Sequence, residues 1–153
     1  MELLSPDDPW ASYARTVVVI TRPDAPSLVV EAAPRAKAGT WPWGSDQPMH
    51  ILTAWDPGEA RPGEAENRER QATLEADLRF LAPDELWAAV GVDPLSGHRE
   101  EGVAVRGLGI DAVTGLARRY GQDAIFEWTP REWAIVACRG GRRLAFGWTV
   151  APE

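Results

Sequence analysis

The sequence predicts an α+β protein in which an antiparallel sheet with a ferredoxin-like βαββαβ core carries two helices on one face. One observation behind this prediction is the order of extended and helical segments between residues 49 and 128. The other is that strand-like segments flank this core and would extend the sheet as hairpins. A length of 153 residues suits one domain. We therefore predict a single domain over 1–153, with an irregular lead-in over 1–12, the core over 49–128 and a C-terminal hairpin over 129–150.

The N-terminal third predicts a hairpin followed by a long loop. Segments 16–21 and 27–32 are rich in β-branched and apolar residues, and the proline-containing stretch between them is typical of a turn. Segment 34–48 contains three prolines and two glycines, and loops of this length are often functional. Segment 49–55 is apolar enough for a buried strand.

Two segments of the core predict helices. Segment 64–81 begins with acidic residues, which suit the positive end of a helix dipole, and Pro83 follows its end. Asp111 fits the N-cap of a second helix ending near residue 120, where Gly121 supplies the left-handed residue common after a helix. Further strands are predicted over 85–91, 101–108, 122–128, 132–138 and 142–150.

The charge and the apolar runs limit the classes of partner. The net charge of −7 comes from 23 acidic and 16 basic residues, and an acidic surface repels phosphate backbones. The N-terminus has no basic region followed by an apolar stretch, and the longest apolar run is far too short for a membrane span. We expect a cytoplasmic protein that binds neither nucleic acid nor membrane.

Motifs for cofactors, metals and nucleophilic catalysis are absent. The chain has no GxxxxGK[ST], HExxH or CxxC motif, and its two histidines, His50 and His98, are far apart in sequence. The single cysteine, Cys138, lies in an apolar run, where it behaves as a small buried hydrophobe. We therefore expect no cofactor and no metal, and no residue is assigned a catalytic role.

The first turns of the long predicted helix carry a polar group of residues. Continuing the helix's apolar stripe backwards places Asn67, Arg70 and Gln71 on the inward face. Buried polar side chains must be paired or face a pocket, and a helix N-terminus with an arginine suits a carboxylate or a phosphate. A purely structural reading is that Arg70 binds a carboxylate such as Glu100, while Asn67 holds the 56–63 loop.

Eight tryptophans is a high number for a chain of this length, and Trp41 and Trp43 lie in the long proline- and glycine-containing loop. They would either fold back as a lid over one end of the sheet or form an exposed surface for a partner. Aromatic side chains are effective anchors of interfaces because they bury a large area at a small entropic cost.

Two motifs resemble a known family. Thr-Ala-Trp-Asp-Pro at 53–57, followed by Glu-Asn at 66–67 and an arginine at 70, is similar to the T-A-W-N-P and E-N-x-x-R pattern of the bacterial domain-of-unknown-function family 3293. Arg-Arg-Tyr-Gly-Gln-Asp-Ala-Ile at 118–125 is similar to that family's R-R-F-G-Q-x-A-I. The resemblance extends from about residue 13 to residue 138.

The sequence departs from the family pattern at two places. Asp56 stands where the family usually has asparagine, and the family's E-P-S appears as Glu-Glu-Gly at 100–102, which keeps the carboxylate and loses the hydroxyl. The resemblance implies no established activity. It does imply a set of polar motif positions, namely Thr53, Asn67, Arg70, Glu100 and Gln122.

Three functions remain open. The first is a binding or regulatory module that uses these five residues, at the N-terminus of helix 64–81, to hold a small polar or anionic ligand or a partner's side chain. The second is a small enzyme with Glu100 as general base and Arg70 as electrostatic clamp, although an adjacent arginine would lower the pKa of the carboxylate and so weaken the base. The third is a protein-interaction module that uses Trp41 and Trp43, or a homodimer joined through a sheet edge or the 34–48 loop.

Overall fold

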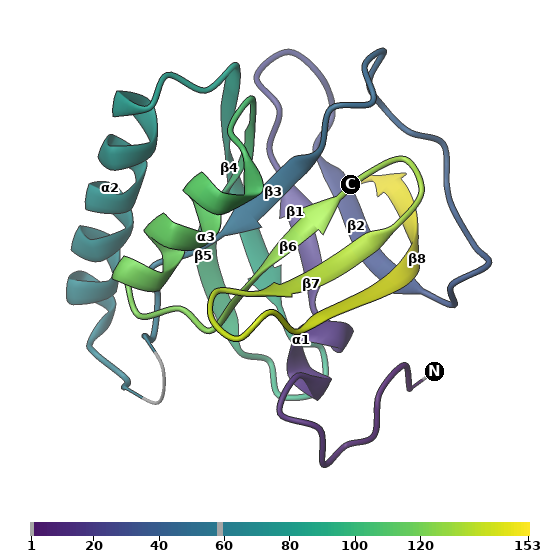
Figure 1. The fold of residues 1–153 in the computed structure, drawn as a ribbon, viewed down its shortest axis with the longest axis horizontal. Coiled ribbons are helices and arrows are strands. Elements are labelled where there is room, and N and C mark those ends of the chain that lie inside the picture. Colours follow the sequence, from purple (N-terminus) through teal and green to yellow (C-terminus); the bar gives the residue numbers. More distant parts are fainter. Residues whose placement is uncertain (1, 58–59) are drawn as a thin grey trace.

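The computed structural model describes residues 2–57 and 60–153, and the strands of this part of the chain form a closed barrel with three helices around it (Figure 1). The elements are α1 (Ala11–Arg15), β1 (Val17–Ile20), β2 (Leu28–Ala33), β3 (Met49–Leu52), α2 (Glu64–Phe80), β4 (Glu85–Val92), β5 (Arg99–Arg106), α3 (Ile110–Arg119), β6 (Ala124–Trp128), β7 (Trp133–Ala137) and β8 (Arg143–Pro152).

The barrel has the strand order β1-β2-β8-β7-β6-β3-β5-β4, and every pairing is antiparallel. It is closed by β1 and β4, whose register pairs Val17 with Val92 and Ile20 with Ala89. Because each of these strands has a neighbour on both sides, none of them offers an unpaired edge.

The strands fold in this way because their residues alternate between the barrel interior and its outside. In β1, Val18 and Ile20 are fully buried while their neighbours are half-buried. Together with Val30, Met49 and Ile51 they belong to the apolar cluster inside the barrel. Burying one such side chain stabilises the fold by roughly 1.5–3 kcal/mol, so this alternation is a strong determinant of register.

A second apolar cluster lies outside the barrel, beneath α2 and α3. Leu74 and Leu78 of α2 and Leu116 of α3 pack there with Val103 and Val105 of β5. Figure 1 shows both helices on the same side of the barrel. The strand they cover, β3, is consequently buried on both faces. None of the described helices is both long and apolar enough to cross a membrane.

The helix α1 lies across one end of the barrel (Figure 1). Trp10 and Ala14 pack against Ile135 and Phe146. At the C-terminal end of the helix, the Arg15 guanidinium contacts the carboxylate of Asp93, just beyond β4, at 2.8 Å.

The fold-class prediction is wrong. The sheet is a closed barrel, not an open ferredoxin-like α+β sheet with flanking hairpins, and a third helix, α1, begins inside the segment predicted to be irregular. The order of helices and strands along 49–128 is compatible with an open or a closed sheet. Closure depends on the pairing of β1 with β4 and of β2 with β8, which joins segments far apart in sequence. It buries the apolar face of the sheet that lies away from α2 and α3.

The predicted cap of α3 is also wrong, whereas the predicted residue beyond its C-terminus is confirmed. The N-cap of α3 is Gly109, without a side-chain cap, and Asp111 lies in the first turn. Gly121 has a φ of 78°, in the left-handed region that glycine adopts without steric cost. Cys138 is buried in the outer apolar cluster, and burial raises the pKa of its thiol to about 11.

Candidate functional site

A cavity of about 270 Å³ lies inside the barrel beneath α1. We call this end of the barrel the cavity end. Its walls include inward-facing apolar side chains from β1, β3, β4, β6 and β7, namely Val18, Ile51, Ala89, Phe126 and Ile135. An eight-stranded barrel is just wide enough for its interior to be filled by side chains or to hold one small ligand.

Small residues create the space at the cavity end. Gly91, Gly102 and Ala124 line it together with Ala89, and Ala89 pairs with Gly102 across β4 and β5. At Gly102 the absence of a side chain is a packing requirement, because an added Cβ would lie 2.7 Å from the carbonyl oxygen of Leu52. The cavity is therefore specified by the sequence of several strands.

The opposite end of the barrel is filled by tryptophans, and we call it the tryptophan end. Trp41 and Trp43 fold back from the 34–48 loop, and their ring centroids lie 5.0 and 5.2 Å from that of Trp128. Trp43 also stacks on Trp87 with centroids 5.9 Å apart, and the Arg106 guanidinium lies 5.0 Å from the centroid of Trp43. Both loop tryptophans are half-buried, as a lid over this end would be.

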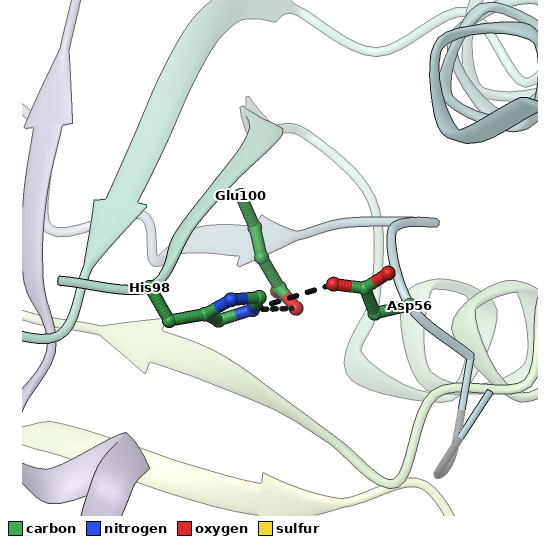
Figure 2. A group of neighbouring side chains, drawn as sticks. All are labelled: Asp56, His98 and Glu100. Atoms are coloured by element: carbon green, nitrogen blue, oxygen red, sulfur yellow. Dashed lines mark hydrogen bonds and ion pairs between the residues drawn. The ribbon is translucent and has the colours of Figure 1, made fainter. Parts of the chain in front are cut away.

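Polar side chains gather at the rim of the cavity. Thr53, His98, Glu100 and Gln122 line it, and Asp56 lies beside them. His98 Nε2 is 3.0 Å from Glu100 Oε1 and 3.5 Å from Asp56 Oδ2. Figure 2 shows both carboxylates on the same side of the imidazole, facing its Nε2. Glu100 points inward because it shares the alternation of Gly102 on β5.

Asp56 is held in an unusual backbone conformation by α2. Its φ is 44°, which aspartate and asparagine tolerate better than most residues. The backbone N–H of Asp56 donates to Asn67 Oδ1 at 3.0 Å, and Asn67 Nδ2 donates to Asp56 Oδ1 at 3.0 Å. Because Asn67 is buried, this reciprocal pair fixes the direction of the Asp56 carboxylate.

Arg70 and Gln71 hold the same segment. Arg70 Nε donates to the carbonyl oxygen of Ala54 at 3.0 Å, and its Nη2 donates to the carbonyl oxygen of Tyr120. Gln71 Oε1 accepts a hydrogen bond from the backbone N–H of Ala54 at 2.9 Å. The guanidinium of Arg70 thus binds backbone carbonyls, and the side chain is not among those that line the cavity.

Thr53 and Gln122 line the cavity, and their side chains also hydrogen-bond to backbone atoms of nearby residues. The Thr53 hydroxyl donates to the carbonyl oxygen of Glu101, and the backbone N–H of Trp55 donates to Thr53 Oγ1 at 3.0 Å. Gln122 Nε2 donates to the carbonyl oxygen of Trp55 at 2.9 Å. Of the five predicted site residues, then, Thr53, Glu100 and Gln122 line the cavity, whereas Asn67 and Arg70 hold the 54–56 segment.

Burial raises the pKa of the Glu100 carboxyl. The hydrogen bond and charge of His98 oppose this rise, and the nearby Asp56 carboxylate adds to it. The lowering expected from an adjacent Arg70 does not apply, because that guanidinium binds carbonyl oxygens instead. Burial also raises the pKa of Tyr13, which lines the cavity, to about 12.

Sequence reasoning missed Asp56 and His98. One donor atom each from Asp56, His98 and Glu100 lies within 4.8 Å of the others, although no contiguous metal motif is present. The available signal was the spacing of His98 and Glu100, since residues two apart on an extended chain share a face. The contribution of Asp56 from a distant loop has no local signal of this kind.

These features define the class of protein as a small closed antiparallel barrel with one filled end and one end that holds a cavity with a polar rim. Residues 52–125 match the model of a family described as a protein of unknown function, DUF3293. The resemblance is confirmed over this segment, which contains all five predicted polar positions. Comparison with curated proteins and with solved structures gave no match.

Proposed function

We propose that the protein binds one small molecule inside the cavity end of the barrel, with the molecule's polar head held at the rim. The observation that carries this proposal is the combination of apolar walls with a polar rim in one cavity of about 270 Å³. Binding sites for small molecules have this composition, with a few placed polar groups that fix orientation.

The rim favours a head group that donates hydrogen bonds. Glu100 and the neighbouring Asp56 offer acceptor oxygens, while the Thr53 hydroxyl and the Gln122 amide already donate to backbone carbonyls. The Arg70 side chain does not reach the cavity, so the only arginine in its described lining is the exposed Arg61, and an anionic ligand has less support than Arg70 suggested. An alkyl or aryl body with an amine or hydroxyl head fits these groups best.

A fluorescent probe tests this proposal without knowledge of the natural ligand. N-phenyl-1-naphthylamine brightens in apolar surroundings, and hexylamine, hexanol and hexanoate can be compared as competitors. We expect hexylamine to displace the probe at the lowest concentration in metal-free buffer, and hexanoate at the highest. Each methylene removed from the amine should weaken displacement about fourfold, because burying one is worth about 0.8 kcal/mol.

A pair of variants on one strand locates the binding. Ala89 faces the cavity and is 3% exposed, whereas the adjacent Ala88 faces outward and is exposed. Ala89→Leu fills the cavity and should reduce probe binding at least tenfold, while Ala88→Leu should leave it unchanged. Equal binding by both variants, or no saturable binding by the wild type, would contradict the proposal.

The interaction alternative has less support from the geometry. Trp41 and Trp43 pack against Trp128, and Trp41 Nε1 donates to the carbonyl oxygen of Ser45 at 2.7 Å. A dimer formed through an open sheet edge would need an unpaired strand, and all eight named strands are paired on both sides.

A further inference from the structure

Asp56, His98 and Glu100 come from different parts of the chain and converge on one point at the rim of the cavity. Asp56 follows β3 in a loop held by α2, while His98 and Glu100 belong to the start of the β5 hairpin. Figure 2 shows the two carboxylates directed toward the same edge of the imidazole. We propose that these three side chains bind one divalent transition-metal ion.

The distances between the donor atoms suit a shared ion. Ligands that lie about 2.0–2.2 Å from a metal at tetrahedral or octahedral angles are separated from one another by roughly 2.8–3.6 Å. His98 Nε2 lies 3.0 Å from Glu100 Oε1 and 3.5 Å from Asp56 Oδ2. A small inward rotation of the carboxylates completes the triangle, since all three atoms are already within 4.8 Å of one another.

A network of hydrogen bonds alone accounts poorly for this arrangement. One ring nitrogen carries at most one proton, yet two carboxylate oxygens approach His98 Nε2. The imidazole nitrogen hydrogen-bonds to Glu100, and the 3.5 Å contact with Asp56 is an ion-pair distance only. Two carboxylates around one imidazole leave a negative charge that a divalent cation would balance.

A hydrogen bond from outside the three-residue cluster orients one of its members, and another member is open to solvent. The Asp56 side chain is only 8% exposed, and Asn67 donates to its Oδ1, which leaves Oδ2 directed toward His98. Such outer hydrogen bonds orient metal ligands and are part of the affinity of most sites. His98 is 45% exposed, so an ion can enter from solvent, and both His98 and Glu100 line the cavity.

The donor set limits the metal. One imidazole with two carboxylates and no thiolate suits Zn²⁺, Mn²⁺ or Fe²⁺ better than Cu⁺, and the imidazole disfavours Mg²⁺ and Ca²⁺. Three protein ligands leave at least one coordination position for water or a ligand atom. A metal here would attract an anionic head group, in contrast to the metal-free rim.

The test uses the full chain without an affinity tag, stripped of metal, and needs no organic ligand. Mn²⁺ is titrated and the free ion is followed by its electron paramagnetic resonance signal, and Zn²⁺ is titrated against a chromophoric chelator. The variants Asp56→Asn, His98→Gln and Glu100→Gln each remove one ligand. Glu101→Gln is the matched control, because Glu101 neighbours Glu100 on β5 but faces away from the barrel interior and lies 3.9 Å from Arg68.

We expect one ion per chain in the wild type, at least about a tenfold loss of affinity in each of the three ligand variants, and no change in the control. Binding that persists in all three variants would identify an adventitious ion only. No stoichiometric binding by the wild type would mean that the cluster is an ion pair only, and either result overturns the proposal.

A measurement on the wild type alone covers the case in which a ligand variant fails to fold. Mn²⁺ broadens the NMR signals of nearby nuclei, so substoichiometric Mn²⁺ should first broaden the amide signals around residues 56 and 98–100. Uniform broadening, or broadening centred elsewhere, would overturn the assignment. This readout needs no probe of the cavity, so the two proposals are tested separately. The metal proposal can fail while the proposed small-molecule function stands, and the small-molecule function can fail while the metal proposal stands.

Discussion

The two ends of the barrel are built from the same strands and differ in the size of the side chains that fill them. Along β4 the inward residues run from Trp87 through Ala89 to Gly91, and along β6 from Trp128 to Ala124. The large residues meet at the tryptophan end, and the small ones surround the cavity. The gradient shows that this sequence concentrates packing at one end of the barrel and leaves space at the other.

The largest expected effect is at the tryptophan end. Trp128 is fully buried, and its ring lies within 6.0 Å, between centroids, of Trp41, Trp43, Trp133 and Trp148. Trp128→Ala should lower the free energy of unfolding by about 3–5 kcal/mol, as buried aromatic truncations do. Urea denaturation followed by circular dichroism measures this. A loss below about 1 kcal/mol would show that the tryptophan end is not the tightly packed end of the barrel.

Asn67→Ala should affect both the fold and the rim. It removes both hydrogen bonds to Asp56, and a buried group left without its partner costs about 1–3 kcal/mol. If the metal site exists, Mn²⁺ affinity should also fall about 10–100-fold. Urea denaturation and the Mn²⁺ titration give the two numbers, and Asn67→Asp, which places a second carboxylate against Asp56 Oδ1 in place of the donor, should lose at least as much stability at neutral pH. Unchanged stability in Asn67→Ala would show that the loop is held by other contacts.

Gly102→Ala tests how tightly the backbone is packed beside the cavity. Although Gly102 lines empty space, its Cβ would lie 2.7 Å from the carbonyl oxygen of Leu52, a backbone atom that cannot rotate aside. We expect a loss of roughly 1–3 kcal/mol by overpacking. In contrast, Gly97→Ala provides a control for a positive φ without crowding, since nothing lies within 4 Å of its Cβ position. Comparing the thermal denaturation of the two variants should separate the cost of backbone strain at residue 97 from the cost of a collision with Leu52 at residue 102.

The smallest effect on stability is expected for the ion pair between Arg15 at the end of α1 and Asp93 just beyond β4. The Arg15 guanidinium beside Asp93 lowers the pKa of that carboxyl to about 2. A depressed pKa in the folded state means that the ion pair stabilises the protein fully above the unfolded pKa of 3.8 and is lost as pH falls through about 2. The difference in urea midpoint between the wild type and Asp93→Asn should therefore shrink between pH 4 and pH 2. A constant difference over that range would contradict this role.

Local patterns predicted most of the elements but not how they pair. The helix predicted over 64–81 is α2, Glu64–Phe80, because its acidic start and the proline after its end are local signals. The strand predicted over 16–21 contains β1, but nothing near it in sequence specifies its pairing with β4. Closure of the barrel depends on how the inward side chains of all eight strands pack together. A short stretch of sequence therefore does not predict it.

The candidate site was predictable to a similar extent. Spacing on the helix correctly turned Asn67 inward, and the family resemblance added Thr53, Glu100 and Gln122, which line the cavity. Helical spacing does not show which group each inward side chain contacts. The Arg70 guanidinium was therefore expected beside a carboxylate, but it binds backbone carbonyl oxygens. The approach of His98 to Asp56 depends on how a loop and a hairpin meet in space.

We expect small molecules to enter the cavity end of the barrel and not the tryptophan end. Methyl NMR of the wild-type protein titrated with hexylamine tests it most directly, because both ends carry inward methyl groups. We predict shifts at Val18, Ile51 and Ile135, which line the cavity, and none at Leu28 or Met49, which belong to the same interior cluster but not to the cavity lining. Shifts confined to Leu28 and Met49, or spread over the outer surface, would contradict the account.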